Sequence, residues 1–171
     1  PDVCVDFTSF NIKDLGGNKV SISNVIGLAP TDSYKVSISY FAGYKASGQL
    51  TVSGPNAYEK AQLTAEIIWK RLKNTGVTFE DTSTEYLGLS SCHGEINALP
   101  SQINEVVLRL GVKDSDKNKV NRFGKELAPV ITSGPPGITG FSGGRPKAQE
   151  IIAYWPALIP KELVHTSVDV V

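Results

Sequence analysis

The feature that most constrains the fold is a glycine- and proline-rich stretch toward the C-terminal end. Residues 134–146 contain five glycines and three prolines, and they end in Arg145 and Pro146. Proline lacks a main-chain donor and glycine weakens both helices and strands, so neither element can run through this stretch. It is therefore predicted to be a long loop that joins a charged helical segment to an apolar strand. Long loops in compact domains are usually functional or disordered, and we predict that this one is shaped and functional.

Alternation of apolar and polar residues predicts most of the strands. The clearest run extends from Tyr34 to Tyr40, and a second run covers 48–52. Ala42 and Gly43 lie between them, so the pattern predicts a hairpin with its turn at these two residues. A turn is also predicted at 15–19, and residues 80–101 show no sustained period. Further strands are predicted at residues 3–8, 20–26, 77–79, 106–112, 150–155 (a buried strand) and 164–171 (an edge strand).

Two helices are predicted from apolar residues at helical spacing. Asn56 is expected to be the N-cap of the first, with Glu59 completing a capping box. Asp114 or Ser115 is expected to cap the second, and Pro129 to limit its length. Strands with two helices on one face predict an α+β two-layer sandwich with a mainly antiparallel or mixed sheet, similar to a split βαβ arrangement.

Composition narrows the function classes. Lysine plus arginine equals aspartate plus glutamate at 17 each, which argues against a nucleic-acid surface as the main function. No apolar run reaches the roughly 20 residues that span a bilayer, and two cysteines are too few for a disulfide framework or a metal knuckle. These features predict a cytoplasmic protein without a metal site, and no cofactor is evident. A length of 171 residues suits one domain, so residues 1–171 are predicted to form a single α+β domain. Because the chain begins at Pro1 and contains no methionine, we expect it to be a fragment of a longer protein.

The glycine-rich loop is the first candidate site. Its main-chain amides could form an anion-binding nest, and its arginine could hold a phosphate or carboxylate with two hydrogen bonds. The spacing matches neither the P-loop nor the dinucleotide-binding fingerprint. Ligand binding and backbone shape alone are both open interpretations of this loop. The candidate ligand-binding residues are Gly134, Gly137, Thr139, Gly140, Gly143, Gly144 and Arg145.

Cys92 and His93 are secondary catalytic candidates. A cysteine paired with a histidine can act as a thiolate nucleophile. Adjacent residues rarely align for this purpose, however, so a small buried cysteine in a loop is the alternative. His165 could act as a general base or simply lie at an exposed edge, and Cys4 is expected to be packed within its strand.

Several segments spread over the chain carry distinctive motifs: residues 1–7 (PDVCVDF), 30–40 (PTDSYKVSISY) with Gly43-Tyr44, 122–129 (RFGKELAP), 133–140 (SGPPGITG), 144–146 (GRP), 154–156 (YWP) and 159–160 (IP). Together they resemble the C-terminal part of the acyclic terpene utilisation protein A family. The resemblance covers nearly all 171 residues, and its most distinctive part is the end of the second helix with the glycine-rich loop.

The resemblance implies a role in catabolism of citronellol- and geraniol-type terpenes, which proceeds through acyl-CoA intermediates. It also implies a longer protein with a preceding α/β region. Our leading hypothesis is a domain that contributes to an acyl-CoA or organic-acid site, with Arg145 holding the negative charge and Cys92 and His93 bordering the same cleft. Whether the protein is an enzyme is left open. The alternative is a non-catalytic docking or assembly domain that is covered by the preceding domain or by a second copy.

Overall fold

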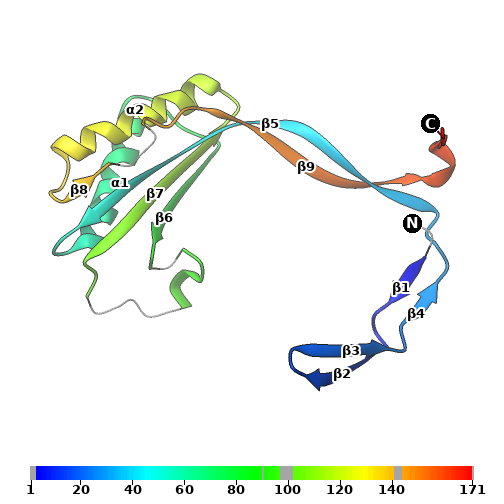
Figure 1. Cartoon of the computed structure of the whole chain (residues 1–171). Helices are drawn as coiled ribbons and strands as arrows, with labels where there is room; N and C mark the ends of the chain where they lie inside the picture. The colour runs from blue at the N-terminus through cyan, green and yellow to red at the C-terminus, as the bar shows by residue number, and fades with distance from the viewer. Residues whose placement is uncertain (1–2, 90, 97–101, 141–143, 171) are drawn as a thin grey trace. The chain divides into compact units, whose positions relative to one another are not determined.

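The computed structural model describes residues 3–89, 91–96, 102–140 and 144–170. Its contacts group the chain into two compact units, which are described separately (Figure 1). The sandwich unit is Phe41–Ala153, and the hairpin unit consists of Pro1–Tyr40 and Tyr154–Val171. Two long strands, β5 (Ser33–Ser53) and β9 (Gln149–Pro160), contribute residues to both units. The prediction of one domain within a longer protein stays a prediction.

The sandwich unit confirms the predicted α+β class. Two helices pack against a mainly antiparallel five-stranded sheet with the order β6-β7-β5-β8, and β9 also pairs with β5. The first six helices and strands follow the order strand, helix, strand, strand, helix, strand, as in split βαβ folds, and β9 comes after them. Besides β5 and β9, its elements are α1 (Ala57–Asn74), β6 (Asp81–Leu87), the short 3-10 helix η1 (Gly94–Ile96), β7 (Glu105–Asp114), α2 (Lys117–Ser133) and β8 (Ile138–Thr139).

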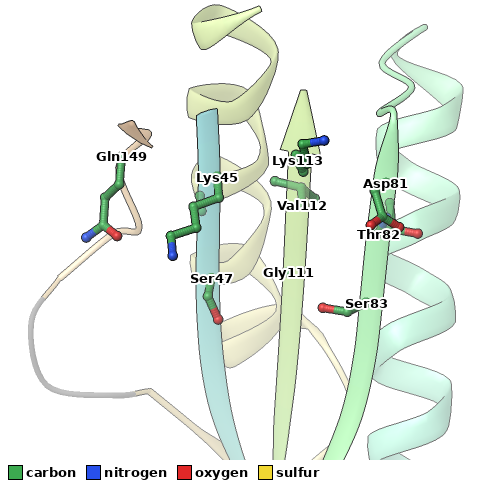
Figure 2. A pocket seen from close by; sticks show the side chains of 10 residues that line it. Lys45, Ser47, Asp81, Thr82, Ser83, Gly111, Val112, Lys113 and Gln149 are labelled. Atoms are coloured by element: carbon green, nitrogen blue, oxygen red, sulfur yellow. The ribbon is translucent and has the colours of Figure 1, made fainter. Parts of the chain in front are cut away.

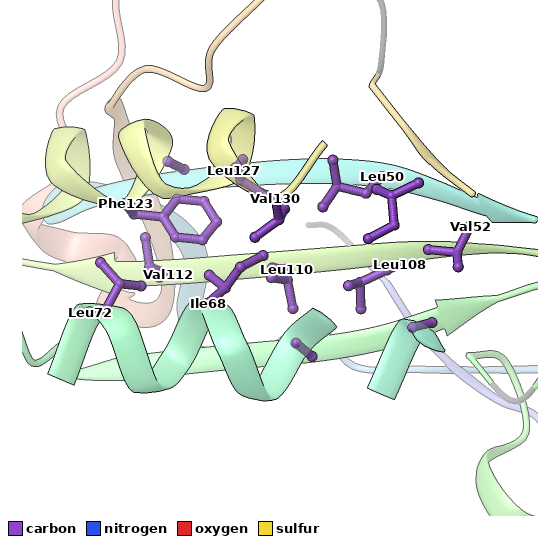
Figure 3. Packing of buried hydrophobic residues seen from close by; sticks show 14 of the residues in the cluster. Leu50, Val52, Ile68, Leu72, Leu108, Leu110, Val112, Phe123, Leu127 and Val130 are labelled. Atoms are coloured by element: carbon purple, nitrogen blue, oxygen red, sulfur yellow. The ribbon is translucent and has the colours of Figure 1, made fainter. Parts of the chain in front are cut away.

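The core lies between the two helices and one face of the sheet (Figure 3). Along β7, alternate residues from Val106 to Val112 are buried, while those between them face away from the helices. Fully burying one such aliphatic side chain stabilises the fold by about 1.5–3 kcal/mol. The helices contribute Ile68 and Leu72 from α1, and Phe123, Leu127 and Val130 from α2. One sheet face is therefore covered, and the other carries mostly polar side chains.

The hairpin unit contains two short antiparallel ladders. Strand β1 (Cys4–Asp6) pairs with β4 (Ile26–Leu28), and β2 (Asn11–Gly16) pairs with β3 (Lys19–Ser23). Gly16, Gly17 and Asn18 adopt φ values of 74°, 59° and 58°, which confirms the turn predicted at 15–19. A short 3-10 helix, η2 (Lys161–Leu163), follows β9. None of the described residues of this unit is buried.

The predicted hairpin with a turn at Ala42 and Gly43 is wrong, because β5 runs through both residues without reversing. Gly43 does adopt a positive φ of 97°. A β-carbon there would lie 3.0 Å from the main-chain oxygen of Asp114, at the end of the β5–β7 ladder. The glycine therefore permits two strands to approach closely and does not reverse the chain. In the sequence, both roles appear as a glycine between two alternating runs.

The predicted N-cap position of the first helix is confirmed, because Asn56 directly precedes α1 as its N-cap residue. The predicted capping box is wrong, since Asn56 lies in the left-handed region at φ 57° and ψ 41° and its side chain makes no capping hydrogen bond. The cap predicted for the second helix is also wrong. Asp116 caps α2 by accepting a hydrogen bond from the Asn118 amide at 2.8 Å. Pro129 lies inside α2 instead of limiting it. Val130 on the same turn is buried in the core, and this packing offsets the hydrogen bond that proline cannot make.

Some strand predictions also need correction. Residues 80–101, where the sequence shows no sustained period, contain the edge strand β6. Its residues are mostly polar and exposed, so they lack the apolar alternation that predicts a strand. Val77 and Phe79 form no strand but pack against the core, so their alternation reflects burial alone. Strand β9 carries no buried residue, contrary to the buried strand predicted at 150–155. Residues 164–170 form no strand, and Val171 lies outside the described residues.

Candidate functional site

The first half of the glycine-rich loop, residues 134–139, makes contacts with the protein's own backbone. The Gly134 amide donates to the carbonyl of Val130 at 3.0 Å and ends α2. The carbonyl of Gly137 accepts from the Ser53 amide at 2.9 Å, and Thr139 belongs to β8, which pairs with β5. Gly137 adopts a φ of 86°, where a side chain would be strained. These contacts fit the interpretation of backbone shape for this half of the loop.

Lys60 anchors the same half of the loop, and sequence reasoning missed it. Its Nζ donates to the carbonyl of Ser53 at 2.6 Å and to that of Pro136 at 3.0 Å. One ammonium thus ties the end of β5 to the start of the loop. Nothing in the sequence distinguishes this lysine from a solvated one. Its partners are main-chain carbonyls, and that of Pro136 lies more than seventy residues away along the chain.

The described end of the loop, residues 144–148, lies along α2. A β-carbon at Gly124 would overlap the carbonyl oxygen of Pro146, so only glycine allows this approach. Asn121 lies one helical turn before Gly124, and its Oδ1 accepts a hydrogen bond from the Ala148 amide at 2.9 Å. Gly48 on β5 provides the matching space on the other side, because a β-carbon there would lie 3.0 Å from Cγ of Pro146. Two glycines and one asparagine therefore hold this segment in place.

A small cavity of about 180 Å³ lies between α2 and the loop. Its walls are mainly apolar side chains and glycine backbone, and Arg145 at its edge is exposed. Across the described ranges, Arg145 has no hydrogen-bonded or ion-paired partner. The cavity thus combines an apolar interior with an available guanidinium. Its lining residues are Gly124, Leu127, Ala128, Ile131, Gly140, Gly144, Arg145 and Pro146.

The structure brings together part of the predicted site. Gly140, Gly144 and Arg145 line one cavity, whereas Gly143 lies outside the described residues. Cys92 and His93 are exposed in the turn before η1 and do not line this cavity. Cys92 is therefore not the buried loop cysteine of the alternative interpretation.

The remaining titratable candidates lie in the hairpin unit. His165 is exposed in the segment after η2, and Cys4 is a half-buried free cysteine of β1. Within the part of the chain that the structure describes, no three His, Cys, Asp or Glu side chains are grouped as a metal site would require. Neither α1 nor α2 meets the length and apolarity needed to cross a membrane, and no other helix among the described residues does.

A larger cavity, of about 340 Å³, lies on the helix-free face of the sheet, the face that carries Lys45, Ser47, Ser83, Gly111 and Lys113 (Figure 2). It is centred on β7, where Gly111 contributes no side chain. All its residues belong to the sandwich unit. The lining consists of Lys45, Ala46, Ser47, Asp81, Thr82, Ser83, Gly111, Val112, Lys113 and Gln149.

Several other charged groups in the sandwich unit are paired. Arg109 donates two hydrogen bonds to Glu85, at 2.7 and 2.8 Å, and these lower the pKa of the Glu85 carboxyl. The main-chain amide of Asp116 holds the pKa of the buried Asp114 below its usual value, although burial alone would raise it. Such groups stay ionised at neutral pH and are engaged by their partners.

Fold and cavity together define a two-layer α+β protein with a small apolar cavity beside an arginine that has no partner among the described residues. Residues 1–170 match the family model described as acyclic terpene utilisation family protein AtuA, and the chain therefore belongs to this family. This membership confirms the resemblance drawn from the motifs and implies a role in acyclic terpene utilisation. Searches of curated proteins and of solved structures found no match.

Proposed function

We propose that this chain contributes a binding site for an acyclic terpenoid acid or its acyl-CoA ester. The observation that supports it is the cavity between α2 and the glycine-rich loop, which combines apolar walls with the guanidinium of Arg145, a group without a partner in the parts of the chain that the structure describes. Acids of acyclic terpenes have this same division, with a branched hydrocarbon chain and one charged end. The family description supports the class of compound, and this cavity is where we propose that it binds.

The cavity dimensions indicate which part of a ligand fits. Sites for complete small molecules usually measure about 300–1,000 Å³, so a cavity of about 180 Å³ encloses one end of such a ligand. Leu127, Ala128 and Ile131 provide the apolar wall. A carboxylate or phosphate outside the wall can accept two parallel hydrogen bonds from a guanidinium. We propose no reaction, because neither Cys92 nor His93 lines the cavity.

Calorimetric titration with two probes tests this proposal. Citronellic acid and citronellol share one branched chain and differ in charge, so their affinities separate the apolar contribution from the ionic one. We expect the acid to bind more tightly. Replacing Arg145→Ala should weaken acid binding about tenfold, as expected for one charge-assisted hydrogen bond of about 1.5 kcal/mol, and leave alcohol binding unchanged.

Lys147→Ala is the matched control, since Lys147 is an exposed cation two residues away that does not line the cavity. It should bind both probes as the wild type does, and neither variant should change the melting temperature. Equal acid affinity for the wild type and Arg145→Ala would refute the proposed arginine role. Absence of binding of both probes would refute the site.

A second candidate function, assembly with a second copy of the chain, is supported by the hairpin unit. This unit has no buried described residue, and its ladders are two-stranded, an arrangement that is marginal in water without further packing. Each ladder also leaves unpaired strand edges, to which the identical edge of a second copy can add. Its four lysines and six acidic residues nearly balance, so two copies would not repel strongly. Its exposed large apolar residues include Phe7, Ile12, Leu15, Val20, Ile22, Val25, Leu28, Trp155 and Leu158.

Sedimentation equilibrium tests the assembly proposal. We expect about twice the 18.3 kDa mass of one chain. A charge in the apolar surface, as in Ile22→Glu, should return the protein to a monomer, whereas Lys19→Glu on the same strand should not. A monomeric wild type would refute pairing with a second copy and favour coverage by another part of a longer protein.

A further inference from the structure

We infer that the cavity on the helix-free face binds a phosphoryl group, as a phosphate monoester or pyrophosphate. This site is distinct from the cavity beside α2 in its lining residues and does not depend on the function proposed above. Three features support it: two lysines at opposed register positions, two hydroxyls beside a glycine, and the balance of charge around the cavity.

The lysines lie directly opposite each other. In the β5–β7 register Lys45 is the partner of Lys113, and both line the cavity. Like charges at directly opposed positions destabilise a sheet. In the described portion of the chain, no ion pair or hydrogen bond engages the Lys45 ammonium. No contact of Lys45 within the described sheet offsets this repulsion. An anionic ligand bound between the two strands would do so.

The neighbouring register row supplies hydroxyl groups. Ser47 and Ser83 are both partners of Gly111, one on each side of β7. Figure 2 shows the Ser83 side chain pointing across the Gly111 position toward β5, and a β-carbon at Gly111 would lie 2.5 Å from its Oγ. Absence of a side chain at this position keeps the floor of the cavity open. Gln149, from the far side of β5, adds an amide donor to the lining.

The charge balance favours an anion. Two ammonium groups and one carboxylate, that of Asp81, line the cavity, so its net charge is positive. Asp81 is the register partner of Lys113 on β6, and the neighbouring Glu80 accepts a hydrogen bond from the Ser115 amide at 3.0 Å. Lys45 faces neither acid across the ladder, which makes it the principal anion-binding group. Ammonium, hydroxyl and amide donors around one open space suit a group with several acceptor oxygens, and lysine commonly binds phosphate as a point charge.

Calorimetric titration with inorganic pyrophosphate and with coenzyme A tests the inference on the full chain. We expect both probes to bind, and Lys45→Glu to weaken both at least tenfold. The matched control is Lys70→Glu, the same charge change at an exposed lysine of α1 outside the cavity, which should bind as the wild type does. Arg145→Ala should bind pyrophosphate as the wild type does. An error in this inference would therefore appear in the pyrophosphate titration, and an error in the function proposed for the cavity beside α2 would appear in the citronellic acid titration.

The melting temperature provides a second readout. Because Lys45→Glu replaces a repulsive pair with an attractive one, it should melt at or above the wild-type temperature while losing affinity. If that variant does not fold, Lys113→Gln replaces it in the titration. Tighter binding of coenzyme A than of pyrophosphate would assign the site to a nucleotide-borne phosphate. Equal affinities for the two probes would assign it to a bare phosphoryl group. Unchanged affinity in the lysine variant, or absence of binding by the wild type at millimolar probe, would overturn the inference.

Discussion

Gly124 is a glycine in the interior of α2, and replacing it with alanine tests how the loop is held against this helix. In an open helix, glycine to alanine stabilises by about 1 kcal/mol, because alanine has the higher helix propensity. Gly124 is not in an open position, since a β-carbon there would overlap the Pro146 carbonyl oxygen. The propensity gain and the steric cost therefore have opposite signs.

The structure allows the net effect to be estimated. Forcing one extra carbon into a packed position costs about 1–3 kcal/mol. Moving residues 144–148 away instead would break the hydrogen bond between the Ala148 amide and Asn121, at about 1 kcal/mol, and separate Pro146 from Gly48. Either route offsets the gain in helix propensity. We expect Gly124→Ala to lower the free energy of unfolding by about 1 kcal/mol, within a range of about 0–2 kcal/mol.

Urea unfolding followed by circular dichroism measures this difference, with the slope of the transition checked for constancy. Hydrogen exchange of the Ala148 amide locates it, because exchange should accelerate locally if the segment has moved from α2. An increase of about 1 kcal/mol in the free energy of unfolding, the value for an unobstructed helix position, would refute the packing of the loop on Gly124.

Two further predictions concern buried carboxylates of the sandwich unit. Glu126→Gln should lower the free energy of unfolding by about 1–3 kcal/mol, measured by urea unfolding at pH 7. The reason is that the Glu126 side chain is 2% exposed and forms an ion pair with Arg71 at 2.8 Å. An effect below about 0.5 kcal/mol would show that this pair is not formed. Asp114 has a lowered pKa, so its stabilisation is complete above the unfolded value of about 3.9 and is lost as the pH falls through its lower folded value. Unfolding measured from pH 6 to pH 2 should therefore show a flatter pH dependence in Asp114→Asn than in the wild type, and parallel curves would contradict this.

The sequence predicted the α+β class because the core strand and both helices carry regular periods. Along β7, Val106, Leu108, Leu110 and Val112 alternate with outward residues over the whole strand, and the structure preserves that period. Edge strand β6 packs less against the core, so its sequence lacks the apolar alternation on which the prediction depended. Local signals at element ends failed for a different reason, since one residue type serves several geometries. Gly43 permits strand approach where a turn was expected.

The cavity beside α2 could be predicted only in part, because its walls come from separate places in the chain. The glycine-rich composition drew attention to Gly140, Gly144 and Arg145. Helical spacing of apolar residues predicted the second helix but could not show which loop residues pack against it. The contact that brings loop and helix together, Gly124 against Pro146, involves one glycine within a helix and one main-chain oxygen. Neither has a recognisable pattern in one sequence.

The two interpretations of the glycine-rich loop apply to different halves of it. Residues 134–139 end α2, pair with β5 and receive the Lys60 ammonium, so backbone geometry accounts for their composition. Gly140 and Gly144 serve another purpose, because both line a cavity beside α2, and Arg145 next to them has no partner in the described structure. A loop required only to connect α2 to β9 has no need of an unpaired arginine beside an apolar wall. The second half of the loop is therefore where the binding proposal rests, and the Arg145→Ala and Gly124→Ala variants test its chemistry and its shape independently.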